Sequence, residues 1–119
     1  MKIKTLKLLI VTLVLLIAFT SCRKDEDTTG DLEVYVEDIN GVPIVGQTVY
    51  LYNNQADFNN VIYSETRTTN NSGRVIFLNL KPGVYYVDCD FNNAAGGVTT
   101  VTGNGSVSAG FVTTITIRP

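Results

Sequence analysis

The sequence predicts an all-β protein in which seven short strands form a two-sheet β-sandwich behind an N-terminal lipoprotein signal peptide. Two observations predict the sandwich. From residue 31 onward, apolar and polar residues alternate with the period of two that is typical of half-buried strands. Turn signals rich in asparagine, glycine and proline interrupt this alternation at short intervals, and no apolar stripe with a helical repeat follows Cys22. Many short strands at this spacing favour a sandwich.

The first element is the signal peptide, which we place at residues 1–21. Three lysines in the first seven residues precede an apolar run at residues 8–19, and two small residues stand directly before Cys22. This order is typical of a secretory signal, and the cysteine completes a lipobox. A retained transmembrane helix is the weaker alternative, since a spanning helix needs roughly 17–25 apolar residues. The resemblance to lipoprotein precursors implies acylation of Cys22, which would anchor the protein stably through two or more acyl chains.

The second element is a charged tether, which we place at residues 22–30. Immediately after the cysteine and one arginine come Lys24, Asp25, Glu26 and Asp27. This run resembles the short acidic export signal that sends some Gram-negative lipoproteins to the cell exterior. The alternative is a solvated linker, because charged runs next to small polar residues need no function beyond keeping a chain unstructured.

The remaining chain has room for one small domain, which we place at residues 31–119. A first strand at residues 32–36 alternates in polarity and leads to the turn signal Asn40-Gly41. A second strand follows around Val49 and Leu51, which alternate with tyrosines. The asparagine-rich residues 53–60 then separate it from a third predicted strand at residues 61–68.

The second half of the domain continues the same pattern. Residues 70–73 form a strong turn signal, because asparagine and glycine accept positive φ angles. Residues 80–83 form another, with a proline preset for its corner. A third glycine-rich turn is predicted at residues 103–105, and the alternation points Cys89 toward the core. Four further strands are predicted, at residues 75–77, 85–91, 97–102 and 111–117.

Two motifs occur in order along these strands. The first centres on residues 40–44 (Asn-Gly-Val-Pro-Ile), and the second on residues 73–77 (Gly-Arg-Val-Ile-Phe) and 82–87 (Pro-Gly-Val-Tyr-Tyr-Val). Together they resemble carboxypeptidase regulatory-like and transthyretin-like domains. The resemblance implies a seven-stranded transthyretin-like (Ig-like) β-sandwich over residues 31–119, with the second strand beside the fifth. It implies little about function, because such folds serve as linkers, stalks and ligand binders alike.

Composition excludes several classes of function. The chain contains no histidine, which excludes Ser-His-Asp and Cys-His nucleophile systems and histidine metal sites. The net charge is −2, and no basic cluster follows Lys24, which argues against nucleic-acid binding. Cys89 would be the one thiol left after lipidation, and no candidate base stands near it. We therefore predict a non-enzymatic protein without a cofactor or bound metal, in which Cys89 is a small buried apolar residue.

Outward-pointing tyrosines are the best candidates for recognition. Tyr50 and Tyr52 on the second strand and Tyr86 on the fifth are predicted to share a face with Asp88. Exposed tyrosines combine a large contact area with a hydroxyl group. The alternative is that tyrosines favour strands and cover a sheet without any partner. Asp88 and Asp90 could also be calcium ligands or a catalytic carboxylate pair, but neighbouring outward positions on one strand favour a solvated sheet face.

These features predict a lipid-anchored outer-membrane protein exposed on the cell surface. We expect its sandwich to be a protein-binding or assembly module, because exposed strands and asparagine-rich loops suit protein contacts and require no catalytic residues. The alternative is a glycan-binding accessory lipoprotein of a polysaccharide-uptake system, which the tyrosine face alone favours.

Overall fold

The structure is a computed structural model of the 119-residue chain, and it describes residues 28–92 and 95–119. The predicted signal peptide, Cys22 and the charged residues 24–27 lie outside the described residues. No helix in the described part of the chain is long and apolar enough to cross a membrane. The regular elements of that part are seven strands and one short helix, so the predicted all-β class is confirmed.

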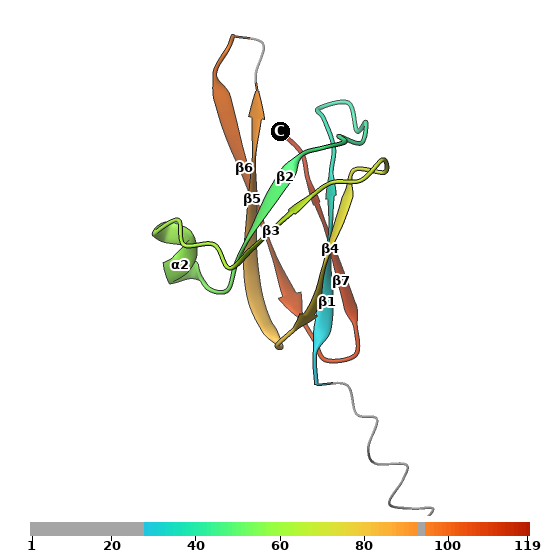
Figure 1. The fold of residues 1–119 in the computed structure, drawn as a ribbon, viewed down its shortest axis with the longest axis vertical. Coiled ribbons are helices and arrows are strands. Elements are labelled where there is room, and N and C mark those ends of the chain that lie inside the picture. Colours follow the sequence, from blue (N-terminus) through green and yellow to red (C-terminus); the bar gives the residue numbers. More distant parts are fainter. Residues whose placement is uncertain (1–27, 93–94) are drawn as a thin grey trace, which may run out of the picture.

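The strands of the described chain form two sheets packed face to face (Figure 1). One sheet has the order β4-β1-β7, in which β1 is antiparallel to β4 and parallel to β7. The other sheet has the order β3-β2-β5-β6 and is antiparallel throughout. The predicted seven-stranded sandwich is therefore confirmed. The strands are, in chain order, β1 (Gly30–Val36), β2 (Thr48–Tyr52), β3 (Glu65–Thr68), β4 (Arg74–Leu80), β5 (Gly83–Asn92), β6 (Val98–Val107) and β7 (Val112–Ile117).

Alternating side chains from both sheets make the core. In β1, every second residue from Gly30 to Val36 is buried, and β5 alternates in the same way from Tyr85 to Phe91. Phe77 from β4 is fully buried among these residues. Cys89 also lies in the core, where burial raises the pKa of its thiol to about 12, so it is a buried apolar residue as predicted.

The glycine-rich turn predicted at residues 103–105 is wrong, because β6 runs through it without a break. Gly105 faces the opposite sheet, where an added Cβ would lie 3.1 Å from Cδ1 of Leu32 and 3.2 Å from Cγ2 of Ile115. The glycine allows the two sheets to approach closely, a role that does not require a positive φ. The chain reverses later, after Ser108, where Gly110 has a φ of 78°.

The segment between β2 and β3 also differs from the prediction. The third strand begins at Glu65 instead of residue 61, and a five-residue helix, α2 (Gln55–Asn59), precedes it. The side chain of Asn54 caps this helix by accepting a hydrogen bond from the Asp57 amide at 2.8 Å. A helix this short and polar has no apolar stripe that a sequence pattern could detect. It lies against the four-stranded sheet, on the side away from β1, β4 and β7 (Figure 1).

Candidate functional site

The outer face of the four-stranded sheet brings the predicted tyrosines together. β2 pairs with β5, as the family resemblance implied, with Tyr50 opposite Asp88 and Tyr52 opposite Tyr86. β6 continues the same face, since Thr102 pairs with Asp88. Directly opposite side chains in antiparallel strands stand about 5 Å apart, close enough for one ligand to contact several of them.

Tyr52 is the exception within this set, because it is 2% exposed and cannot serve as an exposed contact. Phe58 from α2 covers it, with the two rings packed edge to face at 5.2 Å between centroids. The Phe58 ring also stacks on Tyr86 at 5.5 Å, which leaves Tyr86 half-buried. The prediction of an exposed Tyr52 was wrong because strand parity does not reveal what a following helix covers.

Beside the covered tyrosines lies a hollow of about 430 Å³, which we call the tyrosine groove. Tyr63, which follows α2 and is 52% exposed, packs edge-on against Tyr50 at 5.1 Å between ring centroids. Sequence reasoning missed Tyr63 because Val61-Ile62-Tyr63 resembles the start of a strand. The groove combines aromatic, aliphatic and acidic side chains, and its lining residues are Tyr50, Tyr52, Val61, Tyr63, Asp88, Asp90 and Thr100.

Neighbouring hydroxyl groups orient both carboxylates of the groove. The Tyr52 hydroxyl donates to the two carboxylate oxygens of Asp88 at 3.3 and 3.2 Å, and the Thr100 hydroxyl donates to Asp90 at 2.6 Å. Burial, together with the charge of Asp88 acting in the same direction, raises the pKa of Tyr52 to about 12. None of the described residues that line the groove is basic. The groove is therefore a negatively charged, acceptor-rich surface with aromatic walls.

Asp88 gives the fold a measurable pH dependence. Burial raises its pKa above the ordinary value, an effect that the hydrogen bond from Tyr52 offsets only in part. Between the ordinary and the raised pKa, the native state holds more protons than the unfolded chain, so this group lowers stability as the pH rises. A carboxylate whose charge is disfavoured inside a cleft is a candidate functional group.

We expect Asp88→Asn to raise the thermal midpoint at neutral pH, because asparagine carries no charge and its carbonyl still accepts from Tyr52. The gain should shrink as the pH falls below the ordinary pKa of aspartate, where the native and the unfolded wild-type chains both carry protonated Asp88. Thermal unfolding of both proteins from acid to neutral pH measures this. A loss of stability at neutral pH, or a gain that does not change with pH, would contradict the expectation.

The described lining of the groove contains neither a thiol nor a histidine. Its phenol Tyr52 has a raised pKa, and the one described thiol, Cys89, lies in the core instead of the groove. Among the described residues that line the groove, Asp88 and Asp90 are the two that carry carboxylates. Among the described residues, no group of three or more histidine, cysteine or acidic side chains could hold a metal ion.

A second hollow, of about 380 Å³, lies between β3 and β4. Arg67 and Arg74 line it, but each guanidinium already pairs with a carboxylate, that of Glu65 at 3.0 Å and that of Glu33 at 2.5 Å. No aromatic side chain lines it. The tyrosine groove is therefore the stronger candidate site among the described residues.

Comparisons with known proteins establish the fold. No protein-family model and no curated protein matches the chain. A structure from Pseudomonas aeruginosa, named a "putative carbohydrate binding protein", matches 83% of this chain and 94% of its own, with 15% identity and a TM-score of 0.56. The major pilin subunit BcpA of Bacillus cereus matches 76% of this chain at 19% identity and a TM-score of 0.54. The minor pilin GBS52 of Streptococcus agalactiae matches 78% at 17% identity and a TM-score of 0.54. The chain spans 29% and 44% of these two pilins.

Proposed function

We propose that this protein is a surface-exposed outer-membrane lipoprotein whose β-sandwich binds a glycan in the tyrosine groove without acting as an enzyme. The observation that carries the proposal is the juxtaposition of the half-buried Tyr50 ring and the exposed Tyr63 ring with the oriented carboxylates of Asp88 and Asp90. Ring faces pack against the apolar faces of sugars, and carboxylates accept hydrogen bonds from their hydroxyl groups.

The size and charge of the groove support a glycan over a protein. A typical protein partner buries about 800 Å² on each side. The groove, at about 430 Å³, falls instead among sites for small ligands, which span roughly 300–1,000 Å³. Its acidic lining repels acidic sugars, so a neutral glycan fits best. The Pseudomonas neighbour matches this domain along nearly its whole length, and its name describes the same class of ligand.

A glycan array probed with the soluble domain, residues 28–119, tests this proposal. We expect it to retain neutral saccharides, and titration calorimetry with the best of them should give one site per domain. A domain that is folded by circular dichroism but retains no glycan would contradict the proposal. A preference for acidic saccharides would contradict the charge argument while leaving glycan binding itself in place.

Protein assembly is the second candidate, and an exposed strand edge favours it. β6 is ten residues long and forms the edge of its sheet; the Thr113 hydroxyl of β7 already donates to its Ser106 carbonyl, so the open part of the edge is the part near Val98. An extended segment of a partner could add to such an edge through main-chain hydrogen bonds. Two of the neighbours in fold are pilin subunits. Oligomers or partner complexes that persist after Tyr50→Ala would favour this function over glycan binding.

The anchor is proposed from the lipobox and not from the described residues. We expect Cys22→Ala to abolish acylation and to leave the precursor uncleaved, because the thiol is the acyl acceptor. Metabolic labelling with a fatty-acid analogue, followed by a mobility shift on a gel, measures both effects. Label that persists on the variant would contradict the assignment.

We also propose that Lys24, Asp25, Glu26 and Asp27 direct the anchored protein to the cell exterior.

A further inference from the structure

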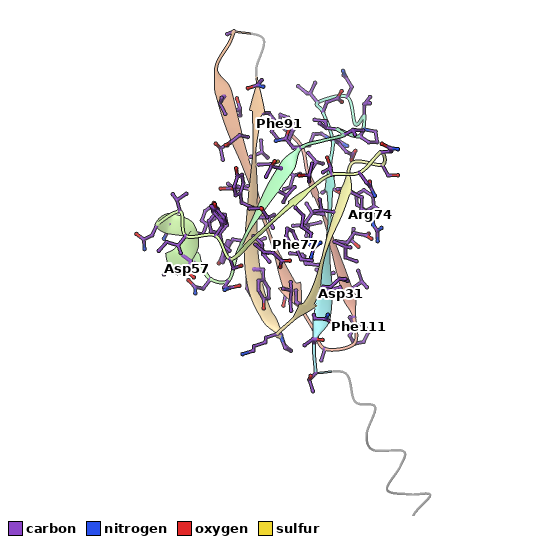
Figure 2. All side chains as sticks on the ribbon, in the orientation of Figure 1. Asp31, Asp57, Arg74, Phe77, Phe91 and Phe111 are labelled. Carbon is purple, nitrogen blue, oxygen red and sulfur yellow. The ribbon has the colours of Figure 1, made fainter. Side chains whose placement is uncertain are left out.

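Three segments meet at the end of the sandwich where β1 begins. The Asp31 amide donates to the Phe111 carbonyl at 3.0 Å, and the Gly110 amide donates to the Thr29 carbonyl at 2.9 Å. The Asn79 amide donates to the Asp31 carboxylate at 3.0 Å, which joins the end of β4 to the same place. Figure 2 shows Asp31 and Phe111 together at this end, which we call the tether end.

The tether end exposes apolar side chains on a rigid support. Phe111 is 68% exposed, although its amide donates to Ser108 and its carbonyl accepts from Asp31. Val112 beside it and Leu78 at the end of β4 are also exposed. The backbone therefore holds the position of Phe111 firmly while most of its surface remains in water.

The described part of the tether end carries one acidic and one basic side chain, so these two charges balance. Between residues 28 and 31, 78 and 84, and 106 and 112, the charged side chains are those of Asp31 and Lys81. The Asp31 carboxylate already accepts from Asn79, while Lys81 lies exposed in the turn between β4 and β5. A lysine at the same end of a domain as an exposed aromatic ring is a combination suited to a lipid headgroup layer.

Chain length identifies what lies next to the tether end. Thr28 lies six positions after Cys22, and an extended chain spans at most about 3.3–3.6 Å per position. The first described residue therefore lies within about 20–22 Å of the cysteine. Apolar side chains such as Ile39 are also exposed at the opposite end, so exposure alone does not select a surface. The tether brings only one end of the sandwich to the membrane.

We propose that the tether end docks on the lipid surface, with Phe111 entering the boundary between headgroups and acyl chains and Lys81 contacting lipid phosphates. The inference rests on the proposed lipid anchor, and it adds a second contact that fixes the orientation of the domain. A contact between domain and lipid that is too weak to bind the protein by itself still forms when a short tether holds the domain close to the membrane. The loop after β1, residues 37–47, then points away from the bilayer, and the outer sheet face with its groove stays open to the medium.

Single-tryptophan variants of the full-length lipidated protein test this docking. The chain has no tryptophan, so Phe111→Trp reports on the tether end and Ile39→Trp, 74% exposed in the wild-type protein, on the opposite end. Each is reconstituted into phosphatidylethanolamine–phosphatidylglycerol vesicles with brominated acyl chains, which quench tryptophan on contact. We expect at least twofold stronger quenching at position 111 than at position 39. Equal quenching, or stronger quenching at position 39, would overturn the inference.

Flotation of the same vesicles separates this inference from the proposed anchor. If both variants float with the lipid and the tryptophan at position 111 stays unquenched, the docking is wrong and the anchor stands. If neither variant floats, the anchor fails and the docking fails with it. Replacing Lys81 with glutamate in the Phe111→Trp protein should reduce quenching while flotation stays complete, and unchanged quenching would overturn the proposed contact with phosphates.

Discussion

Replacing Phe77 with alanine is expected to destabilise the domain by about 3–5 kcal/mol, the usual cost of removing a buried phenylalanine side chain. Phe77 is 0% exposed and pairs with Leu32 in the neighbouring strand β1. Its ring fills the space between the sheets, and no described side chain can replace it without leaving a cavity. A domain of this size has about 5–15 kcal/mol of stability in total, so the loss should be a large share of it.

Urea unfolding followed by circular dichroism measures this loss as a lower midpoint at an unchanged slope. Leu78→Ala is the matched control, because Leu78 is the next residue of β4, points to the other side of the sheet and is exposed. Its removal should cost less than about 1 kcal/mol. Similar losses for the two variants would mean that the inward register of β4 is wrong.

Period-two alternation predicted the fold well because it reports burial directly. In β1 and β5, apolar side chains alternate with polar ones, and the buried residues fall on the predicted positions. Glycine carries less information. In the sequence, a glycine that forms a turn cannot be told from one that allows two sheets to approach closely. For Gly105, only its distance to Leu32 distinguishes the two roles. That contact joins strands far apart in sequence, so no local pattern could reveal it.

The candidate site was predictable to the extent that it depends on strand parity and pairing. The shared face of Tyr50, Tyr86 and Asp88 follows from these two properties alone. The groove, however, depends on the segment between β2 and β3. Phe58 reaches back from α2 to cover Tyr52, and Tyr63 packs against Tyr50. Both contacts are set by tertiary packing of a short polar segment, for which sequence periodicity gives no signal.

The groove residues add little to the stability of the fold, which supports a role outside folding. Burial disfavours the charge of Asp88, so its carboxylate costs stability at neutral pH instead of adding to it. Tyr63 leaves about half of its surface in water, although it packs against the ring of Tyr50. A carboxylate whose charge is disfavoured and an exposed ring at one place are typical of a surface kept for a ligand.

Replacing Tyr50 with alanine is therefore expected to weaken glycan binding by more than tenfold. Aromatic anchors at the centre of a contact typically cost about 2 kcal/mol or more when truncated, and about 1.4 kcal/mol corresponds to a factor of ten in affinity. Tyr50 lies between Asp88 on β5 and the ring of Tyr63, so its loss removes one wall of the groove. Titration calorimetry with the saccharide selected on the array measures the change.

Tyr35→Ala is the matched control for this change, because Tyr35 is a half-buried tyrosine on the outer face of the three-stranded sheet. It should bind the saccharide like the wild-type domain, whereas Tyr63→Ala should lose affinity in the same direction as Tyr50→Ala. The alternative is that the groove tyrosines only shield their sheet. In that case Tyr50→Ala lowers the unfolding midpoint and leaves the affinity unchanged, and this outcome would remove the groove as the binding site.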